Sequence, residues 1–314
     1  MRHGTREHLI LVLEAPAISF GGEVIDNYGV VRDFPARSML TGLLANALGY
    51  DRAEGERLDA LQARIVHASV LARAGARSRD YQTARLFEKD AGWTARGTPE
   101  GRASSPSFTW DALYERERGE RRKSLTHQRY RDFDADGAVL VALALTDADG
   151  PTLDEVADAL ERPERPLFIG RKPHLPARPI LWRPRSPGTT DAARRERTVM
   201  APDAVTALLT VMVAEGWPPC GRAGLRVQWS CSAGPDLAVG ESATLACDGD
   251  EARLVAEARH RIGDERRHVA GVHAGTREVI EGRLHQPRSE AVANLEDPDG
   301  ADALPSPTGD WSAP

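Results

Sequence analysis

Two short apolar runs constrain the fold of this chain more than any other feature of its sequence. The first extends from His8 to Glu14, and the second, AVLVALALT, extends from Ala138 to Thr146. Runs of this length are too short for a membrane-spanning helix, which needs about 20 apolar residues. Short continuous apolar runs are typical of buried strands, and we predict two such strands here. Nothing at the N-terminus resembles a signal peptide, so we expect a soluble, cytoplasmic protein.

Helices and further strands are predicted between these runs. Phe34 to Gly49 has helical apolar spacing, and the capping box Thr152-Leu-Asp-Glu155 begins a second helix. Ala63 to Ala72 and Pro166 to Gly170 predict two more strands, whereas Pro16 to Tyr28 predicts a turn-rich connection. The resulting order favours an α+β fold with the β-α-β-β-α-β plan of a ferredoxin-like or RRM-type domain.

The rest of the chain predicts an insertion, a second region and a tail. Residues 84–124 are basic and interrupted by glycine and proline, which is typical of a projecting arm or a disordered insertion. We therefore expect a first domain at 1–198 with its insertion at 84–124, a small helix-plus-β region at 199–286, and a disordered acidic tail at 287–314.

Charge is distributed unevenly along the chain. The formal net charge is −6 at pH 7, yet residues 71–131 and 162–197 carry an excess of arginine over acid. The three cysteines, Cys220, Cys231 and Cys247, lack the CxxC spacing of a zinc site. We therefore expect local anion-binding surfaces and neither a metal nor a cofactor.

Four segments together resemble a known family. They are FPARSMLTGLLANALGYDR (34–52), RDYQTAR (79–85), LTHQRYRDFDADGAVLVALAL (125–145) and PLFIGRKPHLPARPILW (166–182). In this order and spacing they resemble the CasD family, the fifth Cas protein family, which supplies the subunit that binds the 5′ handle of the guide RNA in type I-E CRISPR Cascade.

The resemblance implies a fold and a set of partners. The fold is a repeat-associated RNA-binding one, with a ferredoxin-like palm, an inserted thumb hairpin and a reduced second domain. The implied partners are the crRNA 5′ handle, the Cascade backbone subunit and the large subunit, with target DNA met indirectly and no membrane. The implied role is non-catalytic, because a separate endonuclease processes the RNA in that subtype.

The candidate RNA-binding residues follow from this resemblance and from side-chain chemistry. A helix N-terminus with a guanidinium binds phosphate, aromatic rings stack on unpaired bases, and a glycine followed by two cations after a strand lets phosphate approach. The residues are Arg37, Ser38, Tyr81, Gln82, Thr83, Thr126, Arg129, Tyr130, Gly170, Arg171, Lys172 and His174. Candidate thumb contacts are Arg85, Arg96, Arg102, Phe108, Trp110, Arg121, Arg122 and Lys123.

Three positions depart from the family's pattern. Ile18 replaces a glutamine in the turn after the first strand, Phe20 follows it, and Met39 replaces a glycine at the helix entrance. Handle contacts from these positions are therefore not expected to follow the family.

Two other functions compete with RNA capping. An endoribonuclease would need a general base, an acid and a cation, which His127, Tyr81, Tyr130 and Lys172 could supply. A pure scaffold would use the same basic surfaces to dock acidic proteins. Salt-sensitive RNA binding by the isolated chain distinguishes the scaffold from both RNA-directed functions.

Overall fold

The computed structural model describes residues 4–25, 28–85, 92–93, 99–100, 126–183, 197–215, 224–247 and 250–285. The strands are β1 (Arg6–Ile18), β2 (Phe20–Ile25), β3 (Tyr28–Arg32), β4 (Ile65–Arg73), β5 (Ala76–Arg85), β6 (Gly92–Trp93), β7 (Pro99–Glu100), β8 (Thr126–Leu145), β9 (Thr198–Ala201), β10 (Leu225–Trp229), β11 (Ser242–Cys247), β12 (Asp250–Ile262), β13 (Arg266–Arg267), β14 (Val272–His273) and β15 (Arg277–His285). The helices are α1 (Arg37–Ala47), α2 (Gly55–Arg64), α4 (Leu153–Glu161) and α6 (Ala204–Ala214).

One 11-stranded sheet organises the fold, and its main path has the order β11-β12-β15-β10-β4-β8-β1-β9. Strand β8 lies between β1 and β4 and is antiparallel to both, with Leu9 opposite Leu143 and His67 opposite Leu143 on the other side. The two apolar runs therefore form central, adjacent strands of the sheet. The predicted α+β class is confirmed.

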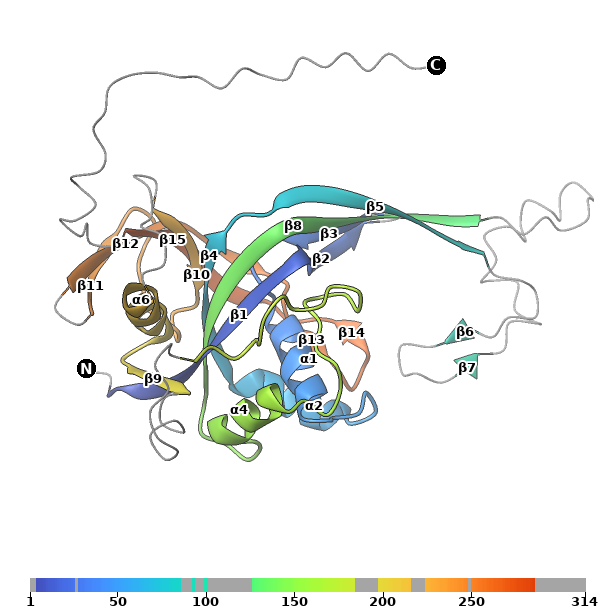
Figure 1. Cartoon of the computed structure of the whole chain (residues 1–314), viewed down its shortest axis with the longest axis horizontal. Helices are drawn as coiled ribbons and strands as arrows, with labels where there is room; N and C mark the ends of the chain where they lie inside the picture. Colours follow the sequence, from blue (N-terminus) through green and yellow to red (C-terminus); the bar gives the residue numbers. More distant parts are fainter. Residues whose placement is uncertain are drawn as a thin grey trace, which may run out of the picture.

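Apolar side chains fill both faces of the central strands. In β1, Leu9, Leu11 and Leu13 pack against the cluster that includes α1, α2 and α4, whereas Ile10 and Val12 pack against the cluster that includes α6. Figure 1 shows these helices on opposite sides of the sheet. Because successive side chains of a strand alternate between faces, coverage on both sides explains why the run is apolar throughout. Each fully buried leucine contributes about 1.5–3 kcal/mol to stability.

The sequence predicts some of the helices and their ends, but not all of them. The capping box is confirmed at α4, where Thr152 accepts from the Glu155 N–H and the Glu155 carboxylate accepts from the Thr152 N–H. Helix α2 was not predicted, because Gly55 and four charged residues obscure its apolar spacing. In the described part of the chain, no helix is long and apolar enough to cross a membrane.

Two segments differ from the sequence-based expectation. Pro16 to Tyr28 is mostly strand, because β1 continues to Ile18 and β2 pairs with β3 through an irregular register that accommodates Gly21 and Gly22. Pro166 to Gly170 is not a strand. The N–H of Ile169 instead donates to the His174 carbonyl across a turn, and the fourth strand of the central group is β9.

The C-terminal strands continue the same sheet. Strand β10 pairs with β4 on one side and with β15 on the other. The expected boundary between residues 198 and 199 falls inside β9, which pairs with β1. The first and second regions are therefore joined by continuous backbone hydrogen bonding, and the expected tail at 287–314 lies outside the described residues.

Stability is expected to fall as the pH is lowered from about 7 to about 5. Burial, with the nearby charge of Arg6, lowers the pKa of His8 to about 4, and burial near Arg277 and Arg37 lowers the pKa of His67. Below the unfolded-state pKa of about 6.5, the unfolded chain binds protons that the folded chain does not, so acid favours unfolding. For His8 alone the loss at about pH 5 is about 2 kcal/mol.

Urea denaturation at the two pH values measures this loss. His8→Leu should reduce the pH dependence, whereas Val239→Ser, which changes an exposed residue without removing a titratable group, should leave it unchanged. Equal unfolding free energies at both pH values in the wild-type chain would contradict the prediction.

Candidate nucleic-acid interface

The structure's most prominent projection is a ribbon made by β5 and β8. These strands pair without interruption from Ala76 opposite Ala135 to Arg85 opposite Thr126, and Figure 1 shows them extending away from the helices. On one edge of β8 the partner changes from β4 to β5 at Asp136, whose φ is 56°, and Arg73 Nη2 donates to the Asp136 carboxylate at 2.8 Å. The excursion at 84–124 therefore begins and ends on a structured base.

Strand pairing brings together predicted residues that are about 45 positions apart in sequence. Tyr81 lies opposite Tyr130, and Gln82 lies opposite Arg129. Thr83 lies opposite Gln128. Arg85 and Thr126 form the last pair, of which only the backbone is described.

Because side chains alternate along a strand, the ribbon has two chemically different faces. We call one the tyrosine face, which comprises Arg77, Arg79, Tyr81 and Thr83 of β5, Tyr130, Asp132 and Asp134 of β8, and Tyr28 of β3. We call the other the arginine face, which comprises Ser78, Asp80 and Gln82 of β5 and Arg129, Arg131 and Phe133 of β8.

The tyrosine face contains a residue that the sequence did not reveal. The rings of Tyr28 and Tyr130 are stacked with centroids 5.2 Å apart, and those of Tyr81 and Tyr130 are 5.4 Å apart. The Arg79 guanidinium lies 5.3 Å from the centroid of Tyr28. The sequence places Tyr28 at the end of a turn-rich connection, and no local signal indicates that it lies beside β8.

On the same face, nearer the start of β5, arginines of β5 pair with carboxylates of β8. Arg77 Nε donates to Asp134 at 2.5 Å and Arg79 Nε donates to Asp132 at 2.6 Å. The hydrogen bond from Arg79 lowers the pKa of Asp132, which keeps this carboxylate ionised. These two pairs are electrically neutral overall.

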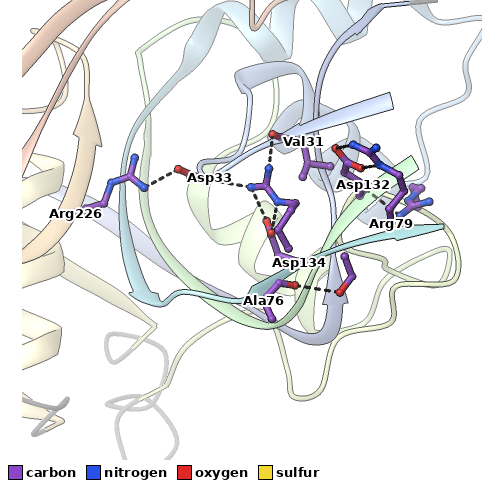
Figure 2. Close-up of polar contacts among 10 residues, drawn as sticks. Val31, Asp33, Ala76, Arg79, Asp132, Asp134 and Arg226 are labelled. Atoms are coloured by element: carbon purple, nitrogen blue, oxygen red, sulfur yellow. Dashed lines mark hydrogen bonds and ion pairs between the residues drawn. The ribbon is translucent and has the colours of Figure 1, made fainter. Parts of the chain in front are cut away.

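Asp33 extends this network to the C-terminal strands. It accepts from Arg77 Nη2 at 3.0 Å and from Arg226 Nη1 of β10 at 2.6 Å (Figure 2). One carboxylate at the β3–α1 turn therefore connects the base of the ribbon to β10.

The arginine face concentrates positive charge. Burial, with the nearby charges of Arg129 and Arg171, lowers the pKa of Arg131. Lys172 is exposed on the segment next to this face. Clustered cations of this kind suit phosphate binding, since each neutralised phosphate releases counterions.

Arg171 has structural partners on three sides. Its Nε donates to Ser19 Oγ at 3.1 Å, its Nη1 to Asp80 at 3.1 Å, and its Nη2 to the Asp132 carbonyl at 3.2 Å. The side chain therefore fastens the segment after α4 to β5 and β8. Its hydrogen bonds within the chain leave Lys172 as the more accessible cation of the pair.

Gly170 and His174 have roles inside the chain. Gly170 has φ of 87°, and a Cβ there would lie 1.7 Å from the Ser19 carbonyl oxygen. The close approach expected toward phosphate is made instead toward β1–β2. His174 is buried against Phe133, with ring centroids 6.1 Å apart, and burial together with Arg171 lowers its pKa.

The helix N-terminus expected to bind phosphate holds an internal carboxylate. The Arg37 N–H donates to Asp264 Oδ2 at 3.2 Å, and the Ser38 N–H donates to the Asp264 carbonyl at 2.9 Å. Arg37 Nη1 also donates to Glu265 at 2.8 Å. An RNA phosphate at Arg37 and Ser38 would therefore have to displace Asp264.

The positions that depart from the family's pattern face the core. Ile18 and Phe20 are buried, and Met39 packs against the same apolar cluster. Their apolar side chains thus stabilise the fold. Most candidate thumb contacts lie outside the described residues, namely Arg96, Arg102, Phe108, Trp110, Arg121, Arg122 and Lys123.

Comparison with known proteins places this chain among CRISPR-associated proteins. The family described as CRISPR-associated protein (Cas_Cas5) matches residues 8–244. Because this match spans most of the chain, the chain belongs to the Cas5 family. No curated protein matches it.

Two solved structures are similar to the chain. One, described as "CRISPR RNA-guided surveillance complex", is 19% identical with a TM-score of 0.50, covering 89% of this chain and 91% of the other. A second, described as "Crystal structure of Cas protein", is 18% identical with a TM-score of 0.45, covering 89% of this chain and 95% of the other. The similarity to the first of these structures supports the mixed α+β fold of this chain.

Replacing Gly170 by alanine is expected to destabilise the chain by about 1–3 kcal/mol, because the positive φ disfavours a side chain and the new Cβ would collide with Ser19. Thermal unfolding measures the effect. Gly42→Ala is the matched control, since a Cβ at this exposed position of α1 meets no atom within 4 Å and alanine favours the helix. Equal melting temperatures for the two variants would contradict the assignment.

Proposed function

We propose that this chain is a non-catalytic subunit of a type I-E CRISPR Cascade surveillance complex. In this role it binds and caps the 5′ handle of the crRNA and joins the backbone subunit to the large subunit. The observation that carries the proposal is the β5–β8 ribbon, which gathers the candidate residues Tyr81, Gln82, Arg129 and Tyr130 in one place. Membership of the Cas5 family supports it.

The arrangement of the central strands supports a ferredoxin-like palm. Strands β4, β8, β1 and β9 are adjacent in that order, and each neighbouring pair is antiparallel. Helices α1 and α2 connect β1 to β4, and α4 lies between β8 and β9 in the chain. This is the split β-α-β pattern of such domains. The ribbon then corresponds to the base of the thumb.

RNA capping uses the arginine face for phosphates in this proposal. Arg129 and Arg131 lie on β8, and Lys172 lies on the segment that Arg171 fastens beside them. The pairing of β8 with β5 and the hydrogen bonds of Arg171 hold the backbone segments that carry these cations beside one another, which reduces the entropic cost of ordering them around RNA. Phosphate contacts orient the RNA and give affinity without reading its sequence.

Lys172→Ala combined with Arg129→Ala is expected to weaken guide RNA binding by roughly 10- to 100-fold, because each of the two contacts contributes about 0.5–1.5 kcal/mol net of solvation. Filter binding of the crRNA handle at low and moderate salt measures the loss, which should be larger at low salt. Arg171→Ala is unsuitable alone, because it also removes three internal hydrogen bonds. Arg267→Ala, which removes an exposed charge from β13, is the matched control. Unchanged affinity in the double variant would refute the phosphate-binding assignment.

Mapping the RNA ends separates capping from cleavage. The chain is co-expressed with the neighbouring CRISPR proteins and a repeat-spacer transcript, then purified, and the ends of the bound RNA are determined. We expect mature ends to be unchanged in His127→Ala, Tyr81→Phe and Lys172→Ala, because a separate enzyme makes them. Loss of mature ends in any variant would identify this chain as the endoribonuclease. Recovery of the protein complex with no RNA bound to this chain would support a scaffold.

A further inference from the structure

Three tyrosines form a row across three adjacent strands. Strand β3 is parallel to β8 with Tyr28 opposite Tyr130, and β5 is antiparallel to β8 with Tyr81 opposite Tyr130. The ring of Tyr130 contacts both neighbours, at centroid distances of 5.2 and 5.4 Å. The row therefore has Tyr130 at its centre and one tyrosine on either side.

The outer rings of this row are exposed. Tyr28 is 44% exposed and Tyr81 is 55% exposed, whereas a tyrosine whose role is core packing is largely buried. Neighbouring strands that carry exposed aromatic rings side by side present a continuous apolar surface to solvent. Packing among the described residues leaves both rings accessible to a partner.

The charges next to the row are already neutralised. Arg79, which lies over the Tyr28 ring, is paired with Asp132, and Arg77 is paired with both Asp134 and Asp33. On the described part of the arginine face, Arg129 and Arg131 of β8 outnumber the one carboxylate, Asp80 of β5. The two faces therefore suit different parts of one ligand. The tyrosine face suits flat rings, and the arginine face suits phosphates.

We propose that Tyr28, Tyr130 and Tyr81 form a platform on which unpaired nucleobases of the RNA stack. The inference rests on the proposed function and deepens it, because it names the bases as the ligand of the tyrosine face. Among the described strands, β5 pairs with β8 alone, so one edge of β5 has no neighbouring strand. This edge is the boundary between the tyrosine face and the arginine face. A single RNA strand that crosses this edge contacts phosphate-binding cations on one face and stacking rings on the other. Base stacking of this kind tolerates any sequence, since every base has a π-face.

The test compares two probes that differ only in their bases. The full chain is titrated with a single-stranded RNA of about 12 nucleotides and with an abasic ribose-phosphate strand of the same length. Tyr28→Leu should weaken binding of the RNA about ten-fold and leave binding of the abasic strand unchanged. Tyr28→Phe should retain the affinity, because it keeps the ring. A 2-aminopurine in the RNA should lose fluorescence on binding to the wild-type chain, and Tyr28→Leu should reduce that loss.

Controls separate stacking from folding and from general loss of apolar surface. Melting temperatures identify unfolded variants, and Tyr81→Leu provides a second, independent substitution. Val239→Ser removes an exposed apolar residue elsewhere and should change neither affinity.

Three outcomes overturn the inference. If the tyrosine variants weaken both probes equally, the rings only shape the ribbon, and RNA capping stands. If the variants bind both probes normally but no longer assemble with the other Cas proteins, the tyrosine face docks protein, and RNA capping again stands. If the wild-type chain binds neither probe, both the platform and the proposed function fail.

Discussion

Backbone hydrogen bonding along β8 is the interaction on which the rest of the structure depends. Its C-terminal half pairs with β1 and β4 inside the core, and its N-terminal half pairs with β5 and, at Tyr130 and Arg131, with β3. One continuous strand therefore belongs both to the core and to the projecting ribbon. The orientation of the ribbon is set by core packing, because Leu140 and Leu143 on the same strand are fully buried.

The sequence predicts the core better than the connections. The apolar runs at His8–Glu14 and Ala138–Thr146 and the Thr152 capping box depend on local chemistry, and each forms the predicted element. Gly21 and Gly22 suggested turns, but hydrogen bonding to β3 holds them in a hairpin. Local propensity is weak where pairing with a distant or irregular partner determines the structure.

The sequence likewise predicts the positions of some residues of the candidate site and not of others. Tyr81 and Tyr130 could be placed together, since both flank one insertion and strand pairing aligns them. Tyr28 and Asp264 could not, because Tyr28 reaches Tyr130 through a third strand and Asp264 reaches Arg37 across 227 residues. The sequence predicts close approach of a phosphate at Gly170, whereas the group that lies close to Gly170 in the structure is the Ser19 carbonyl of this chain. Sequence spacing indicates that a position is constrained without identifying the atoms that constrain it.

The cap on α1 has a consequence for how the chain acquires its structure during synthesis. The N–H groups of Arg37 and Ser38 receive their partner only when Asp264 arrives, and Arg277, which pairs with Asp264 at 2.6 Å, is made later still. Until the ribosome has released most of the chain, the first turn of α1 depends on water for its hydrogen bonds. Contacts of such long range slow folding, because the loop must close before the contact forms. The first turn of α1 is thus completed by a residue made 227 positions after Arg37, and a truncated product that ends before Asp264 leaves that turn without its partner.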